Sequence, residues 1–276
     1  MNKTQVQKIL SSFMTEEEKK LTTTFIEKGY LTTQTSDRSA LDNIQQLVAN
    51  LTGEFLGMGR PSDAVDFLEN IHTKIDASEI NNLRLHVFRG MNQEPWLREA
   101  YFCCARKTIE TLVGNELAMQ KNINLSIQMP QDTTSVLPVH ADVWSGDSPY
   151  EIVLWIPYVN VTGTKCMFIL PEEKHVKHIS QMEKNGVNST SEIMDQIRED
   201  LTWVEMEYGE VMLFTQNLMH GNVTNIEIST RWSSNCRFKS VLSPYSDKKL
   251  GEFFEPISLR GATILGADYK MPNFKG

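Results

Sequence analysis

The spacing of apolar residues changes near residue 120, and this change divides the chain into two parts of different structure. Before it, apolar residues recur every three or four positions over 41–55, with similar helical spacing over 63–71, 80–87 and 95–112. After it, apolar residues alternate with polar ones over 123–129, as in a strand with one buried face. The chain is therefore predicted to begin with helices and to continue as a β-rich region.

Further short strands are predicted after the first one, at 136–142, 152–158, 166–170, 203–207, 211–215 and 229–241. Short strands separated by polar turns are typical of a β-sandwich or jelly roll. A polar, helix-like stretch at 176–200 is interpreted as an insertion between strands. We predict one domain over 1–276, mainly β with N-terminal helices (α+β). Its helical part would reach about residue 118, and its double-sheet core would cover about 120–245.

Charge and composition exclude several classes of protein. The net charge of −8 leaves no basic stripe of the kind that binds nucleic-acid phosphates. No segment approaches the roughly twenty apolar residues of a membrane span, and residues 1–20 lack the apolar run of a signal peptide. The four cysteines have no CxxC spacing and are interpreted as reduced thiols. We therefore expect a cytoplasmic protein that binds a small molecule.

The most informative histidine belongs to the tripeptide His140-Ala141-Asp142, inside a predicted strand. Side chains two positions apart on a strand point to the same face, so one imidazole and one carboxylate would project together. Such a pair supplies two ligands of a 2-His-1-carboxylate metal site, which leaves three positions of an octahedral iron open. A second histidine from a distant strand would complete that site.

His220 is the best candidate for the distant ligand, because it follows a hydrophobic strand and precedes Gly221. The next strand offers Arg231, eleven residues beyond His220, and Ser233 on the same strand face. An arginine inside a β-core is costly without a carboxylate partner. A dicarboxylate cosubstrate would provide that partner, held by the guanidinium fork beside the serine hydroxyl.

These motifs together resemble the phytanoyl-CoA dioxygenase-like family of the Fe(II)- and 2-oxoglutarate-dependent oxygenases. The resemblance covers roughly residues 120–240 and includes the segments between the metal motifs. Those segments are Leu154-Trp155-Ile156-Pro157-Tyr158, the stretch from Met167 to His175, Tyr208-Gly209-Glu210 before the second-histidine strand, and Arg231-Trp232-Ser233-Ser234-Asn235-Cys236-Arg237. The sequence departs from the family pattern in turns, at Glu172-Glu173-Lys174 and at Glu210. These departures bear on loop shape, and not on the metal ligands.

The resemblance implies a double-stranded β-helix (jelly roll) with iron held by His140, Asp142 and His220. It implies that Arg231, assisted by Ser233, binds the distal carboxylate of 2-oxoglutarate. Trp155 stands where family members often carry an aromatic residue near the cosubstrate. Together these residues imply a dioxygenase that couples the oxidation of 2-oxoglutarate by O2 to hydroxylation of a substrate.

Hydroxylation is favoured over halogenation because related halogenases carry a small residue in place of Asp142. The region between the motifs is also similar to oxygenases encoded in bacterial surface-carbohydrate clusters, which implies a sugar or a sugar-containing compound as substrate. Two alternatives stay open: a cupin-like metal-dependent isomerase, and a jelly roll that binds a ligand without turnover. Arg231 and Ser233 distinguish them, since an isomerase needs no dicarboxylate anchor at that spacing.

Other polar residues are interpreted more plainly. His175 and His178 have the spacing of a metal pair but fall in a predicted turn and insertion, which favours a solvated or structural role. Trp144, Asp147 and Tyr150 follow Asp142 in a predicted loop and are candidate substrate contacts at the mouth of the site.

Arg237 shares a strand face with Arg231 and would meet either a substrate anion or a structural carboxylate. The segment 91–98 and the insertion at 176–200 are candidate lids over the site.

Overall fold

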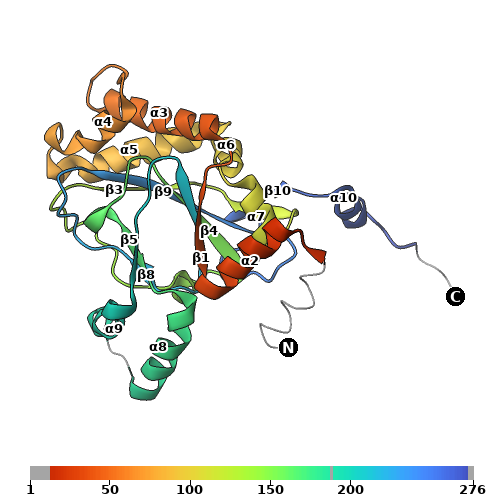
Figure 1. The fold of residues 1–276 in the computed structure, drawn as a ribbon. Helices are drawn as coiled ribbons and strands as arrows, with labels where there is room; N and C mark the ends of the chain where they lie inside the picture. The colour runs from red at the N-terminus through yellow and green to blue at the C-terminus, as the bar shows by residue number, and fades with distance from the viewer. Residues whose placement is uncertain (1–12, 187–188, 273–276) are drawn as a thin grey trace.

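The computed structural model describes residues 13–186 and 189–272, which form helices packed against two antiparallel β-sheets (Figure 1). The helices are α2 (Glu16–Lys28), α3 (Arg38–Phe55), α4 (Ala64–Glu69), α5 (Ile80–Gln93), α6 (Leu97–Cys103), α7 (Arg106–Val113), α8 (Glu172–Asn185), α9 (Thr190–Ile197) and α10 (Gly261–Ala267). The strands are β1 (Tyr30–Gln34), β2 (Leu117–Gln120), β3 (Asn124–Gln128), β4 (Glu151–Pro157), β5 (Met167–Ile169), β6 (Thr202–Val204), β7 (Glu210–Thr215), β8 (His220–Gly221), β9 (Arg231–Ser240) and β10 (Phe254–Ser258). The predicted α+β class is confirmed.

The larger sheet has seven strands in the order β1-β7-β4-β9-β2-β10, and β3 pairs with β9 beside β2. The smaller sheet has the order β6-β5-β8. All pairs are antiparallel, and β9 is central: it pairs with β4, β2 and β3 along its length. A long, buried central strand of this kind can hold side chains in fixed positions on both of its faces.

The two faces of β9 have opposite chemistry. Trp232, Cys236 and Phe238 belong to the apolar core that the larger sheet shares with the helices. The alternate residues, beginning with Arg231 and Ser233, point to the other side and are mostly buried there. The indole Nε1 of Trp232 donates a 2.9 Å hydrogen bond to the carbonyl of Leu68, which ties β9 to α4.

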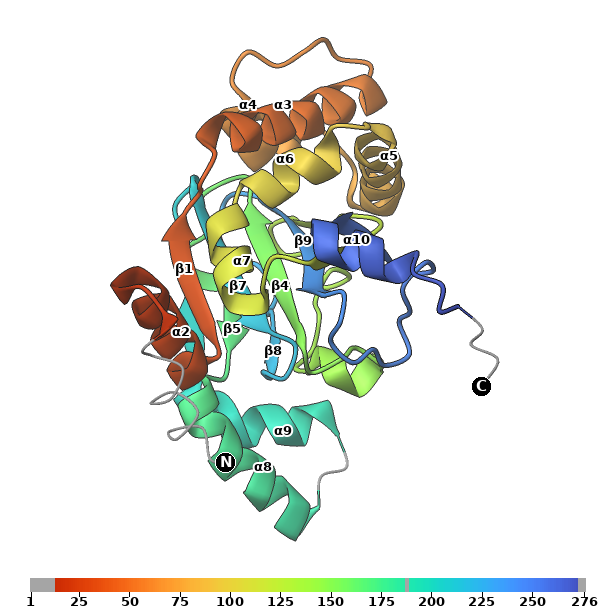
Figure 2. The ribbon, with the colours of Figure 1, turned by 90° about the vertical axis from the view of Figure 1, so that its right-hand side faces the viewer.

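The elements form layers on the two sides of the larger sheet (Figure 2). Helices α3 to α6 cover one face and bury the stripe Leu41, Ile44 and Val48 of α3. Between the two sheets lies a second apolar cluster, with Phe214 from β7 and Met167 from β5. Helices α8 and α9 lie on the outer side of the smaller sheet (Figures 1 and 2).

The segment 136–142 is not the strand that the sequence predicted. Only His140 pairs, through an isolated bridge to His220. Pro138 has no N–H to donate, so a continuous ladder cannot run through this segment. The backbone instead bonds to Asn222, whose N–H donates to Leu137 O at 3.0 Å.

The predicted helix at 95–112 is divided into α6 and α7. The Cys104 carbonyl accepts hydrogen bonds from Ser36 N at 2.7 Å and Thr35 Oγ1 at 3.1 Å. These partners are far away in the sequence, so helical spacing alone could not predict the break.

Strands of the larger sheet also lie outside the predicted core. The helical part contributes β1 and β2 to the larger sheet, and β10 lies beyond residue 245. The insertion begins at Glu172, before the predicted position 176, and forms the hairpin of α8 and α9.

Cys103, Cys104, Cys166 and Cys236 are free thiols, as predicted. No helix in the described part of the chain is long and apolar enough to cross a membrane. The absence of a signal peptide was predicted from residues 1–20, of which residues 1–12 lie outside the described residues.

We predict that Leu41→Ala lowers the free energy of unfolding by roughly 2–5 kcal/mol, because Leu41 is fully buried between α3 and the larger sheet. The matched control is Leu265→Ala on α10, where the side chain is 76% exposed and the change should stay within about 0.5 kcal/mol. Urea unfolding followed by circular dichroism measures both, and equal losses would contradict the packing described.

Candidate metal and cosubstrate site

The two histidines of the site are brought together by a backbone pair. His140 N donates to His220 O at 3.0 Å, and His220 N donates to His140 O at 2.8 Å. Residues directly opposite in an antiparallel pair project their side chains to the same face. The two imidazole centroids are consequently 4.3 Å apart.

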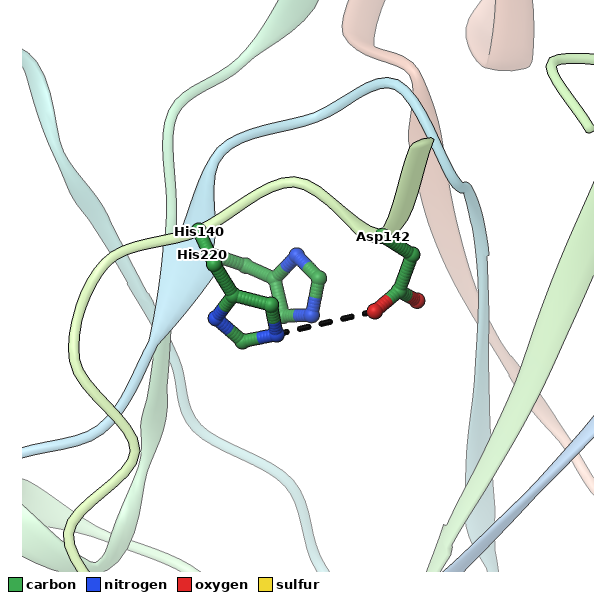
Figure 3. A group of neighbouring side chains, drawn as sticks. All are labelled: His140, Asp142 and His220. Carbon is green, nitrogen blue, oxygen red and sulfur yellow. Dashed lines mark ion pairs between the residues drawn. The ribbon is translucent and has the colours of Figure 1, made fainter. Parts of the chain in front are cut away.

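Asp142 joins the histidines from the start of a short 3-10 turn, Asp142–Ser145. Ala141 before it has extended backbone angles, φ −120° and ψ 135°, so His140 and Asp142 still point to the same side without a regular strand. The His140 Nε2 and Asp142 Oδ1 atoms are 3.5 Å apart (Figure 3). One donor atom from each of the three residues lies within 4.8 Å of the others.

Hydrogen bonds of the Nδ1 atoms of His140 and His220 fix the orientation of the two rings, so that each Nε2 faces the site. His140 Nδ1 lies 2.8 Å from Pro138 O, and His220 Nδ1 lies 2.9 Å from Leu218 O. A carbonyl only accepts, so each Nδ1 carries the hydrogen and each Nε2 keeps its lone pair. Metal-binding histidines are oriented in this way in proteins.

The environment favours two of the three residues in the form that binds a metal. Burial lowers the pKa of His220 to about 4, so its ring is neutral at pH 7. Burial would raise the pKa of Asp142, but the hydrogen bond with His140 and the positive charges around it hold that pKa at about 2. Burial alone would lower the pKa of His140, but the hydrogen bonds with Asp142 and with the Pro138 carbonyl outweigh it and raise that pKa.

Gly221 has a steric role beside the second histidine. A Cβ at this position would lie 2.7 Å from both Leu137 O and the Phe168 ring, and 3.1 Å from Pro138 O. Only a glycine allows the segment before His140 to approach β8 this closely. The His-Gly sequence therefore supports the pairing that brings the two imidazoles together.

Arg231 is buried next to the same cavity without an acidic partner. Its Nη1 donates to Lys165 O at 3.3 Å and its Nη2 donates to Ser126 Oγ at 3.2 Å. No described carboxylate pairs with the guanidinium, whose Nε has no hydrogen-bond partner, and burial lowers its pKa to about 10. The Ser233 Oγ is likewise buried without a hydrogen-bond partner. Two unsatisfied buried donors on one strand face fit an anionic ligand.

The three potential metal-binding side chains and Arg231 line one cavity of about 370 Å³, whereas the predicted Ser233 is buried and does not line it. The cavity lining includes His140, Asp142 and His220, then Arg231, and the predicted Trp155. It also includes residues that the sequence prediction missed, which are Arg84, Asn124, Ser126, Thr134, Ser135, Asn222 and Asn235. Asn124 and Ser126 are the polar positions of the alternating strand β3, so their direction was predictable even though their role was not.

The residues predicted at the mouth of the site differ in burial, and none of them lines the cavity. Asp147 does not line the cavity: its side chain is buried and pairs with Arg237 Nε at 2.9 Å and Lys248 Nζ at 2.5 Å. Trp144 and Tyr150 are about half exposed and do not line the cavity. Arg237 does line it, and of the two partners predicted for it, the carboxylate is present.

His175 and His178 lie on α8, and not in a turn as predicted. His178 Nε2 makes a 2.7 Å hydrogen bond with Asp200 Oδ2, a structural contact that connects α8 with the turn after α9. Within residues 13–186 and 189–272, the only group of three or more potential metal-binding side chains is His140, Asp142 and His220.

No protein-family model and no curated protein matches the sequence. Solved structures do match the fold. They include a non-heme monooxygenase, the ThoJ–Ni complex (12% identity, 87% of this chain and 84% of that chain, TM-score 0.55). EctD from S. alaskensis with 2-oxoglutarate and 5-hydroxyectoine also matches (15% identity, 84% of this chain and 78% of that chain, TM-score 0.57). The non-heme alpha ketoglutarate dependent carbocyclase SnoK from nogalamycin biosynthesis matches as well (15% identity, 89% of this chain and 97% of that chain, TM-score 0.54). At these identities the likeness shows a shared fold.

We predict that His220→Ala weakens anaerobic Fe(II) or Co(II) binding by more than about 100-fold. Losing a ligand should cost more than losing an outer hydrogen bond to a ligand, which costs about 10–100-fold. His178→Gln is the control, because its imidazole belongs to the α8–α9 hairpin. Equilibrium dialysis gives both affinities, and equal binding by the two variants would exclude His220 as a ligand.

Proposed function

We propose that this protein is an Fe(II)- and 2-oxoglutarate-dependent dioxygenase that hydroxylates a small organic substrate. His140, Asp142 and His220 would hold the iron, and Arg231 with Ser233 would hold the distal carboxylate of 2-oxoglutarate. The observation that carries the proposal is the buried Arg231, which has no acidic partner in the described chain and faces the cavity of the three metal-binding side chains.

The donor chemistry of the site fits both groups. Two imidazole nitrogens and one carboxylate form the set that non-heme Fe(II) oxygenases use. A buried arginine with open donor capacity suits one carboxylate of a dicarboxylic acid, which it can bind through two hydrogen bonds. The matching S. alaskensis EctD structures, one with bound Fe and one with 2-oxoglutarate, support the same pair of groups.

The protein's own residues would bind, orient and exclude water. When bound, iron with 2-oxoglutarate and O2 supplies the oxidising chemistry. Arg231 and Ser233 set the direction of the cosubstrate, while Trp155 and Phe214 give the cavity apolar walls. The side of the cavity formed by 134–137 would then receive the substrate.

Several finer assignments belong to the same proposal. The two sheets would form a double-stranded β-helix in a single cytoplasmic domain of the phytanoyl-CoA dioxygenase-like family. The carboxylate of Asp142 favours hydroxylation, because it fills the position that a halide needs in halogenases. Hydroxyl and amide groups of the cavity, such as Asn124 and Ser135, suit a sugar or sugar-containing substrate. A cupin-like isomerase would leave Arg231 unexplained, whereas a binding protein without turnover would form no succinate under air.

We predict that Arg231→Gln weakens 2-oxoglutarate binding by about 10- to 100-fold while metal binding is retained. Hydrogen bonds to a charged group contribute roughly 1.5–3 kcal/mol, which corresponds to that factor. The measurement is an anaerobic titration of the Fe(II) protein with 2-oxoglutarate, following the visible charge-transfer band of the chelate.

Arg106→Gln is the matched control, because Arg106 is exposed on α7 and pairs with Glu110. Unchanged 2-oxoglutarate affinity in Arg231→Gln would show that the anchor is wrong. Absence of the band in the unmodified protein, with no succinate formed under air, would contradict the proposed function itself.

A further inference from the structure

Arg237 is a second arginine on the polar face of β9, and it joins two buried carboxylates. Its Nη2 lies 3.4 Å from Asp142 Oδ2, and its Nε lies 2.9 Å from Asp147 Oδ1. Its Nη1 donates to Gln120 Oε1 at 3.3 Å, whereas the contact of Nε with Asp147 Oδ1 is an ion pair without hydrogen-bond geometry. The side chain is only 12% exposed, so these contacts are poorly screened by water.

The contact with Asp142 involves the oxygen that points away from the histidines. Asp142 Oδ1 is the atom near His140 Nε2 (Figure 3). Asp142 Oδ2 is the atom near Arg237. A carboxylate that binds a metal through one oxygen leaves the other to be fixed by a neighbouring group. Here that neighbour is a cation on a rigid central strand, which limits rotation of the carboxylate.

Arg237 is itself held in place by a second pair of charged side chains, Asp147 and Lys248. The Asp147 side chain is 1% exposed and lies between Arg237 and Lys248, whose Nζ is 2.5 Å from Asp147 Oδ2. Along the series Asp142, Arg237, Asp147 and Lys248 the charges alternate and cancel. Removing one member would leave a buried charge without its partner, which is costly.

We propose that Arg237 is a positioning residue that holds Asp142 in the orientation needed to bind the metal, and that Asp147 and Lys248 hold Arg237 in place. This inference rests on the proposed function, because it takes Asp142 as a metal ligand. It makes Lys248, which lies after β9 and far along the chain from the histidines, an indirect support of the metal site.

A purely structural role is the competing explanation. Lys248 belongs to the segment after β9, so the same ion pairs would also tether that segment to the loop that contains Asp147. A tether affects stability alone. A positioning role affects metal affinity and the ligand geometry in protein that is still folded.

The test compares Arg237→Met, Arg237→Lys and Asp147→Asn with the unmodified protein, using anaerobic Co(II) as the probe. Metal affinity and the visible d–d spectrum of the bound Co(II) are measured, with the melting temperature as the check on folding. We expect Arg237→Met to weaken Co(II) binding by about 10–100-fold and to change the spectrum. Arg237→Lys should recover part of the affinity, and Asp147→Asn should show a smaller loss than Arg237→Met.

Co(II) affinity within twofold of the unmodified protein and an unchanged spectrum in Arg237→Met would overturn the proposal, whatever happens to the melting temperature. If Arg237→Met does not fold, Asp147→Asn decides in the same way. Failure of the unmodified protein to bind Co(II) would instead contradict the proposed function, so the two failures are distinguishable.

Discussion

The candidate site depends on two backbone hydrogen bonds between His140 and His220. They pair two segments that are far apart in the sequence, and they place both imidazoles on one face. Gly221 permits the close approach, and the extended Ala141 brings Asp142 to the same side. Without this pairing, the imidazole of His220 would have no reason to converge on His140 and Asp142.

Strand β9 lies between the apolar core and the cavity, and its two faces carry apolar and polar side chains, respectively. Trp232 and its alternate neighbours bury their side chains against the helices, which stabilises the strand. The opposite face presents Arg231 toward the cavity proposed for the cosubstrate and Arg237 toward Asp142. A rigid strand with two such faces holds charged groups at fixed positions, and the unsatisfied Arg231 shows where an anion would restore the balance of charge.

Much of this arrangement was predictable because it depends on local patterns. Alternation predicted β3, and the His140-Ala141-Asp142 spacing predicted a convergent pair even though Pro138 prevents a regular strand there. The partners in long-range contacts were not predictable. The role of Asp147 depends on Lys248, and the break before α7 depends on bonds that only the folded chain makes. The residues proposed as iron and 2-oxoglutarate ligands were all predicted, whereas most of the polar lining of the substrate region was not.

The most direct test of the central claim is an anaerobic crystal structure with Fe(II) and 2-oxoglutarate. The account predicts a metal bound by Nε2 of His140, Nε2 of His220 and one oxygen of Asp142. It also predicts the distal carboxylate of 2-oxoglutarate against Arg231 and Ser233, with the other oxygen of Asp142 facing Arg237. A metal bound elsewhere, or a cavity in which 2-oxoglutarate does not contact Arg231, would contradict it.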